Sequence, residues 1–148
     1  LLIKKKNSKI TYACTSKIKN NKKSPHKKLK ENLEMKDFIL SNPGCQVSNL
    51  IVEKNLFIGI GGFDDYVIPS NDKDFLIRAI YFGFKYNVLE KNLVIQNKHN
   101  NEQITDQNQE FLIGMKRFYK KHVWVTNVSI KVKFWIKYWK IYLKTILK

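Results

Sequence analysis

The sequence predicts a mixed α/β domain followed by a C-terminal amphipathic helix, and three observations support this fold class. Segments rich in β-branched and aromatic residues, the pattern of a strand, lie on both sides of a segment with helical periodicity at residues 71–83. Residues 131–148 repeat lysine at helical spacing opposite a wide apolar face. The length of 148 residues fits one ordinary domain, and the 43% hydrophobic and 13% aromatic content is that of a chain able to bury a core.

The first half of the chain predicts a strand, a helix and a second strand in that order. Residues 9–18 (KITYACTSKI) alternate loosely and favour a strand. Residues 29–42 place leucines at helical spacing and stop at "NPG", which predicts a helix. Residues 45–57 indicate a strand followed by a short turn of helix. The "GIGG" that comes next requires a tight turn of the backbone.

The second half predicts two helices and a strand region before the tail. Residues 71–83 (NDKDFLIRAIYFG) have the clearest helical pattern in the middle of the chain, and Gly83 ends it. Residues 85–96 predict one or two short strands, and residues 105–122 a helix opened by a Thr or Asp cap.

Charge is distributed unevenly along the chain. The net charge is +16, yet all twelve acidic residues lie between Glu31 and Glu110, so both flanks are strongly basic. Basic flanks fit a polyanionic partner, either nucleic acid or anionic lipid. A lysine-rich composition that only solvates the surface explains them equally well.

Cysteine usage and hydropathy indicate a cytosolic protein. Cys14 and Cys45 are far apart and have no metal-ligand spacing, so we expect reduced thiols and neither a disulfide nor a cysteine metal site. No run of eighteen apolar residues occurs, and the first residues (LLIKKKNSK) lack the apolar core of a signal peptide.

The tail has the composition of a helix that lies on a membrane surface. Lysines fall on one helical stripe at Lys133, Lys137, Lys140, Lys144 and Lys148. The rest of the helix is apolar and includes Trp135 and Trp139, whose rings would settle at headgroup depth while the lysines meet anionic phosphates. The expected location is therefore the inner face of the membrane, with the protein bound peripherally. A helix packed on the domain, or a contact between two copies, is the alternative.

Residues 61–105 carry a resemblance to a known family. The matching positions are Gly61, Gly62, Phe63, Asp64 and Asp65, then Asn71, Asp72, Asp74 and Arg78, then His99, Ile104 and Thr105. In this order and spacing they resemble the C-terminal part of the catalytic domain of family 2 glycosyltransferases, which have the GT-A fold. The likeness extends over about residues 9–122. We expect the chain to divide into this catalytic-domain part at residues 1–122 and a basic aromatic tail helix at residues 123–148.

The resemblance implies the transfer of a sugar from a nucleotide-diphosphate donor to a saccharide or lipid-linked acceptor, as in polysaccharide biosynthesis. It places Asp72 as the general base that takes the proton of the acceptor hydroxyl. It implies a divalent cation, Mg²⁺ or Mn²⁺, for the leaving diphosphate, with His99 as a ligand. The residues that the resemblance assigns to acceptor binding are Gly62, Phe63, Asp64, Asp65 and Arg78.

Simpler interpretations of the same residues stay open. Carboxylates in a first helical turn are favoured by the helix dipole, which accounts for Asp72 and Asp74 without catalysis. Asp74 points about 200° away from Asp72 on a helix and is expected to pair with Arg78. Asp64 and Asp65 also fit a solvated turn, and His99 a polar loop.

One part of the family pattern has no counterpart in these 148 residues. The donor-binding half, with a DxD at the end of a strand, is absent, and the "DKD" at residues 72–74 opens a helix instead. We therefore expect a truncated or split glycosyltransferase with no transfer activity by itself. The alternatives are a basic module that binds nucleic acid, which is less favoured because no nucleic-acid motif is found, and an inactive remnant.

Overall fold

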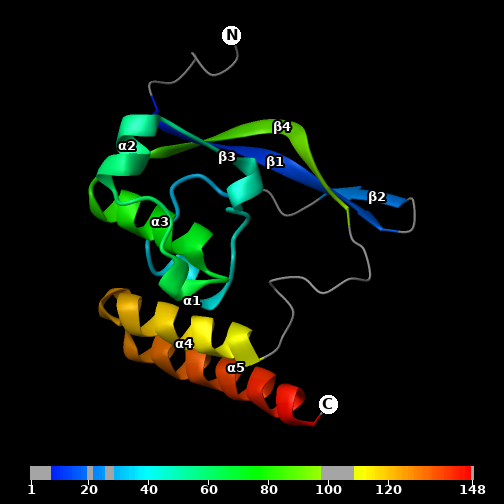
Figure 1. Ribbon diagram of the computed structural model, residues 1–148, viewed down its shortest axis with the longest axis vertical. Coiled ribbons are helices and arrows are strands. Elements are labelled where there is room, and N and C mark those ends of the chain that lie inside the picture. Colours follow the sequence, from blue (N-terminus) through cyan, green and yellow to red (C-terminus); the bar gives the residue numbers. More distant parts are fainter. Residues whose placement is uncertain (1–7, 20–21, 26–28, 98–108, 148) are drawn as a thin grey trace.

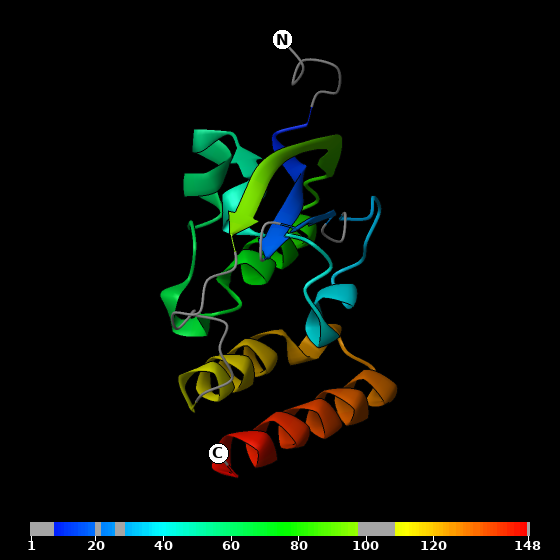
Figure 2. The same cartoon turned by 90° about the vertical axis from the view of Figure 1, so that its right-hand side faces the viewer.

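The protein has three layers in a computed structural model of the chain. A sheet forms the first layer, helix α3 (Asn71–Tyr81) lies beneath it, and helices α4 (Gln109–His122) and α5 (Val128–Ile146) form an antiparallel pair on the other side of α3 (Figure 1). The view at 90° in Figure 2 shows the same order of layers. The residues that the structure describes are 8–19, 22–25, 29–97 and 109–147.

The sheet is built around strand β1 (Ile10–Lys19). Strand β4 (Tyr86–Asn97) pairs with β1 in parallel along its length, with a register shift on either side of Cys14. On the opposite edge, β3 (Leu50–Val52) and β2 (Lys22–Pro25) pair antiparallel with the two ends of β1. The α/β class and both predicted strands are confirmed, and the region expected to hold one or two strands is a single strand with an irregular register.

Helix α3 supplies the centre of the core. Phe75, Leu76, Ile77 and Ala79 are fully buried, and they belong to the same apolar cluster as Ile10 of β1. The helix predicted at residues 71–83 is confirmed as α3. Its apolar side chains recur with helical spacing, and Gly83, just after its last turn, has a positive φ of 81° that ends the helix.

The helix predicted before "NPG" is wrong over most of its length. Only α1 (Asp37–Leu40) forms there. Asn32 has a φ of 57°, which breaks a right-handed helix. The Tyr86 hydroxyl accepts a hydrogen bond from the backbone N–H of Leu33 at 3.0 Å and donates to the Lys30 carbonyl at 2.7 Å. A side chain of β4 therefore satisfies backbone groups that a helix would have paired internally.

The segment between α1 and α3 follows the predicted order with one addition. A 3-10 turn, η2 (Val47–Asn49), precedes β3, and the short helix α2 (Lys54–Gly59) follows it. The tight "GIGG" turn is confirmed, since Gly61 and Gly62 have φ values of 90° and 62°. A Cβ at Gly62 would also lie 3.3 Å from the Phe57 ring, so the position has little room for a side chain.

Helices α4 and α5 pack against each other through aromatic rings, and both contact the rest of the domain, α4 at the turn before α3 and α5 at α1. The rings of Tyr119 and Phe134 stack with centroids 4.0 Å apart. Gly114 of α4 lies against the Ile68 carbonyl so closely that a Cβ would come within 1.6 Å of that oxygen. Both predicted helices are confirmed, although the expected Thr or Asp cap of α4 lies outside the described residues. The expected division at residue 123 falls on the 3-10 turn η4 (Val123–Val125) that joins them.

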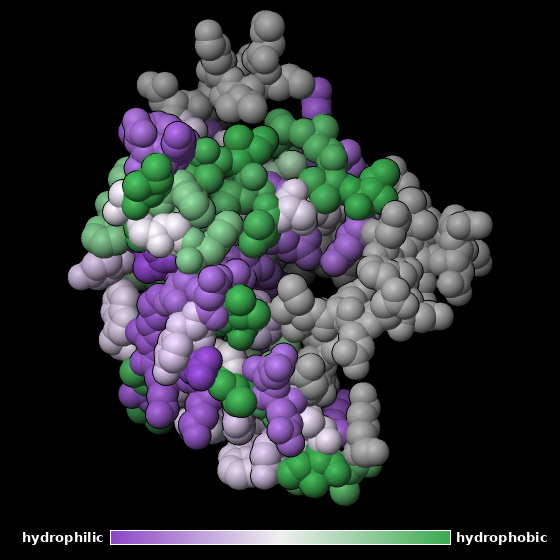
Figure 3. Space-filling view, viewed as in Figure 1, coloured by the Kyte–Doolittle hydropathy of each residue, from purple (hydrophilic) through white to green (hydrophobic). Residues whose placement is uncertain are grey.

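Two hydrophobic areas stand out on the face of the molecule shown in Figure 3. Figure 3 shows apolar residues over the sheet and α2, and again at the C-terminal end of α5. Among the described residues, no helix is both long and apolar enough to cross a membrane.

Candidate functional site

The candidate site is the first turn of α3, where two carboxylates leave the helix in different directions. The helix begins at Asn71, whose Oδ1 accepts a hydrogen bond from the backbone N–H of Asp72 at 3.1 Å. Asp72 Oδ1 in turn accepts from the N–H of Lys73 at 2.7 Å. Asp72 is partly exposed, whereas Asp74 is fully buried. The opposite orientation expected for these two carboxylates is therefore reflected in different surroundings.

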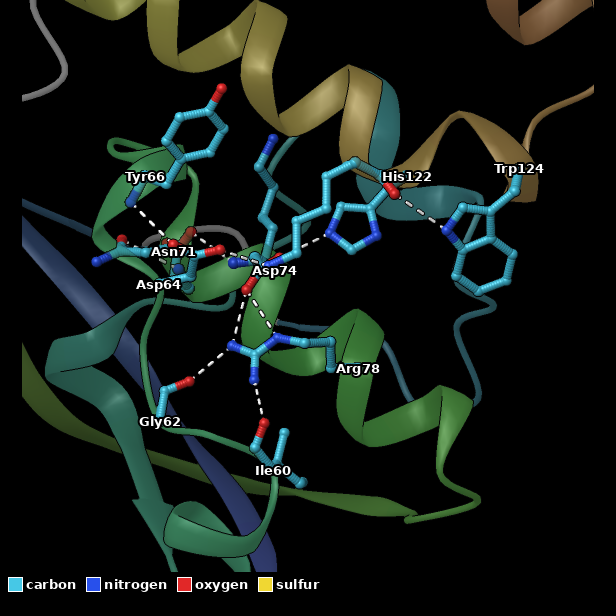
Figure 4. Close-up of polar contacts among 12 residues, drawn as sticks. Ile60, Gly62, Asp64, Tyr66, Asn71, Asp74, Arg78, His122 and Trp124 are labelled. Atoms are coloured by element: carbon cyan, nitrogen blue, oxygen red, sulfur yellow. Dashed lines mark hydrogen bonds and ion pairs between the residues drawn. The ribbon is translucent and has the colours of Figure 1, made fainter.

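Asp74 is the centre of a buried charge network (Figure 4). Arg78 Nε and Nη2 lie 2.8 and 2.7 Å from its Oδ2. Lys121 Nζ and His122 Nε2 lie 2.7 and 2.8 Å from its Oδ1. Burial alone would raise the pKa of the Asp74 carboxyl, but the hydrogen bonds from His122, Lys121 and Arg78 outweigh it and lower that pKa to about 2. The expected pairing of Asp74 with Arg78 is confirmed.

Arg78 connects this network to the glycine turn. Its Nη1 donates to the Ile60 carbonyl at 2.5 Å and its Nη2 to the Gly62 carbonyl at 2.6 Å. The guanidinium thus holds the turn between α2 and α3 in place, with Asp74 as its counter-ion. The resemblance assigns Arg78 to acceptor binding. In the structure its guanidinium contacts Asp74 and the two carbonyls of the glycine turn.

The other residues expected to bind the acceptor surround this turn. Asp64 accepts from the backbone N–H of Tyr66 at 2.9 Å, which caps the 3-10 turn η3 (Asp65–Val67), and it pairs with Lys121 at 2.6 Å. The hydrogen bond from Lys121 lowers the pKa of Asp64. The Phe63 ring packs inward, with its centroid 5.6 Å from that of Phe75. Asp65 is exposed at the surface of the turn.

Asp72 lies in a second polar cluster, on the side of α3 that faces the loop after α1. Asn42 Nδ2 donates to Asp72 Oδ2 at 2.9 Å and to the Cys45 carbonyl at 2.6 Å. Burial raises the pKa of Asp72 above its ordinary value, against the opposing effect of the Lys73 N–H and charge and of the Asn42 amide. Asp72 is close enough that its charge adds to the effect of burial in raising the pKa values of Tyr12 and Cys45.

Lys73 gives this cluster a cation. Burial lowers the pKa of the Lys73 ammonium to about 8, although the charge of Asp72 acts in the opposite direction. Its Nζ lies 4.2 Å from the centroid of the Phe118 ring, a cation–π contact with α4. The Tyr12 hydroxyl is buried and has no hydrogen-bond partner in the described part of the chain. The cluster therefore holds a carboxylate, an amine and a phenol.

The metal expected from the resemblance finds no ligand set here. In residues 8–19, 22–25, 29–97 and 109–147, no three His, Cys, Asp or Glu side chains are gathered so that they could hold an ion. His99, the ligand expected from the sequence, lies outside the described residues. The two cysteines are free thiols, as expected, with Cys45 buried.

Sequence analysis missed several members of both clusters. Lys121 and His122 are 47 and 48 positions beyond Asp74, and no local pattern joins them to it. Asn42 had one available signal, because Asn before Pro-Gly commonly uses its side chain to order a turn. Its Oδ1 does accept from the Gly44 N–H, at 2.9 Å.

Comparisons with protein-family models, with curated proteins and with solved structures return no match for this chain. The geometry of the two clusters is therefore the basis for a function.

Proposed function

We propose that this chain forms the acceptor side of a glycosyltransferase catalytic site, in which Asp72 is the general base. The resemblance of residues 61–105 to family 2 glycosyltransferases suggests the reaction class. The observation that carries the proposal is the contrast between two carboxylates in one helical turn. Hydrogen bonds from His122, Lys121 and Arg78 lower the pKa of Asp74 to about 2, and burial raises the pKa of Asp72. Environments that separate the pKa values of neighbouring carboxylates are typical of an acid–base site.

Asp72 has the properties that the chemistry requires. A carboxylate that is partly desolvated and has a raised pKa is a stronger base than a solvated one. Asn42 holds one of its oxygens, so the carboxylate has a defined orientation. Its partly exposed position leaves it accessible to an acceptor.

The proposed step moves one proton and exchanges one bond at the anomeric carbon. The acceptor oxygen bonds to the anomeric carbon of the donor sugar as its proton passes to the Asp72 carboxylate. The bond from that carbon to the diphosphate oxygen breaks, and the nucleoside diphosphate leaves with the electron pair. A divalent cation would neutralise the charge on the leaving diphosphate, and the described residues assign it no ligands.

The Asp74 network has a positioning role in this proposal. Arg78 holds the glycine turn, and Lys121 joins Asp64 to Asp74. These contacts fix the loop that carries Asp64 and Asp65 relative to α3, and therefore relative to Asp72. A rigid frame of this kind keeps an acceptor aligned with its base.

The test supplies the donor-binding half that the proposal requires. The chain is fused to the donor-binding half of a family 2 glycosyltransferase and assayed with nucleotide-diphosphate hexoses, Mg²⁺ or Mn²⁺, and saccharide acceptors. We expect transfer by the fusion, none by the 148-residue chain alone, and a loss of about 10²–10⁴-fold in kcat for Asp72→Asn. Glu110→Gln, at an exposed carboxylate in the first turn of α4, is the matched control. Transfer that survives Asp72→Asn contradicts the assignment of the base. A fusion without transfer, together with a chain that binds no saccharide by saturation-transfer NMR, contradicts the function.

A further inference from the structure

Helix α5 has two apolar faces, and the domain covers only one of them. Taking about 100° of rotation per residue from the buried Phe134, Ile141 lies about 20° away and Tyr138 about 40° away on the same side. These side chains face the domain, where Phe134 and Ile141 are buried. The helix is therefore already anchored by its inner face, and docking on the domain does not account for the rest of its apolar residues.

The second apolar face lies outward. It covers an arc from about 100° to about 220° on the same wheel. Five of its side chains line a shallow groove of about 520 Å³, and two of these, Trp139 and Leu143, are 53% and 54% exposed. We call this the outer face of α5, and its members are Val132, Trp135, Ile136, Trp139, Leu143, Ile146 and Leu147.

Lysines border the outer face on both sides. Lys131 and Lys140 line the groove itself. In a projection down the axis of α5, Lys133 and Lys144 lie next to Lys140. They are about 100° and 80° from Phe134, in the direction opposite to the tryptophans. Lys137, which was expected to join them, instead donates a hydrogen bond to the Leu40 carbonyl at 2.6 Å. It therefore connects α5 to α1 and is not part of the basic border.

The composition of this surface favours one kind of partner. Exposed tryptophan rings prefer the headgroup region of a bilayer, and lysine stems reach from there to anionic phosphates. A second copy of the chain fits less well, because residues 111–148 contain no acidic side chain. Two outer faces packed together would bring their lysine borders side by side without counter-charges, which is destabilising.

We propose that the outer face of α5 docks the protein on the surface of an anionic lipid bilayer. The helix lies in the plane of the interface, with Trp135 and Trp139 among the headgroups and Lys131, Lys140 and Lys144 on the lipid phosphates. Tyr138 and Tyr142 remain on the protein side. This proposal is independent of the chemistry at Asp72, since it rests on α5 alone.

A matched pair of tryptophans provides the test. Trp124 is 55% exposed, close to the value for Trp139, but it lies on η4 and donates its indole N–H to the Lys121 carbonyl. The full chain is titrated with vesicles of phosphatidylcholine containing phosphatidylglycerol. We expect Trp139→Ala to weaken binding about tenfold or more and Trp124→Ala to leave it unchanged. Circular dichroism confirms that both variants keep their helices.

Charge and depth are measured separately. Lys140→Gln and Lys144→Gln should each weaken binding about fivefold, and vesicles of phosphatidylcholine alone should bind far less. In a Trp124→Phe variant all tryptophan emission comes from α5, and lipids brominated near the headgroup should quench it.

Three results would overturn the proposal. The first is an absence of binding to anionic vesicles by the full chain, and the second is binding that Trp139→Ala leaves intact. The third is a partner of another class: a dimer in sedimentation that Trp139→Ala dissociates, or binding to single-stranded RNA without binding to vesicles.

Discussion

Replacing Asp74 with asparagine should destabilise the protein more than any other single change of a carboxylate in this site. The substitution keeps the shape of the side chain and removes its charge from a fully buried position. Four nitrogen contacts of 2.7–2.8 Å, from Arg78, Lys121 and His122, then lose their common acceptor charge. Breaking a buried ion pair by removing one partner costs about 3–5 kcal/mol, because the other charges stay buried.

The structure places the expected loss at the lower end of that range. Arg78 keeps the carbonyls of Ile60 and Gly62 as acceptors, and Lys121 keeps Asp64. We therefore expect Asp74→Asn to lower the free energy of unfolding by about 3 kcal/mol. Urea unfolding followed by circular dichroism measures this as a lower midpoint with an unchanged slope. Asp65→Asn, at an exposed carboxylate, should stay within about 0.5 kcal/mol of the parent protein.

The pH dependence gives an independent check. The folded pKa of Asp74, about 2, lies below its ordinary value of 3.8. The unfolded chain therefore binds the proton more readily, so ionised Asp74 contributes stability above about pH 4 and loses it as the pH falls toward 2. Asp74→Asn should flatten this part of the stability curve. A loss below about 1 kcal/mol with an unchanged acid limb would refute the reasoning. If the variant does not fold, Lys121→Met, which removes only one cation, should show a smaller loss of the same kind.

Three further predictions concern packing and reactivity. Gly114→Ala should lower the free energy of unfolding by about 3 kcal/mol or more in the same urea assay, because a Cβ there would overlap a backbone carbonyl. Gly59→Ala, where a Cβ meets nothing within 4 Å, should be neutral or stabilising. Equal effects of the two substitutions would contradict this packing. Lys73 should titrate near pH 8 in NMR spectra of reductively methylated protein. Because its pKa in the folded protein is lowered from 10.5, the folded state becomes more stable as the pH rises from about 8 to about 10.5. A titration near 10.5 would contradict the burial of Lys73. Iodoacetamide should label the partly exposed Cys14 well before the buried Cys45, whose thiol pKa is raised by burial, and labelling of both at one rate would show that the loop after α1 opens freely.

Local pattern was enough to predict the elements whose own side chains supply the core contacts. The helix at 71–83 and the tail helix were predicted correctly because their apolar side chains recur with helical period. The prediction of a helix at residues 29–42 was wrong, and the reason cannot be found in the sequence of that segment. Tyr86, more than fifty residues later, takes the hydrogen bonds of its backbone.

The candidate site divides in the same way. Asp72 and Arg78 were singled out by the family resemblance, and the pairing of Asp74 with Arg78 followed from one turn of helix. Lys121 and Asn42 were not found, because each reaches its carboxylate from a distant part of the chain. Their contacts are what separate the two carboxylates chemically.

From residue order alone one could infer an α/β chain, a helix opened by two carboxylates, and a basic aromatic tail helix, because these features depend on neighbours within a few positions. The environment of each carboxylate, and the part of the tail that stays uncovered, depended on how α3, α4 and α5 pack. Burial and long-range hydrogen bonds set a side chain's pKa and exposure, and they exist only once distant segments are in contact.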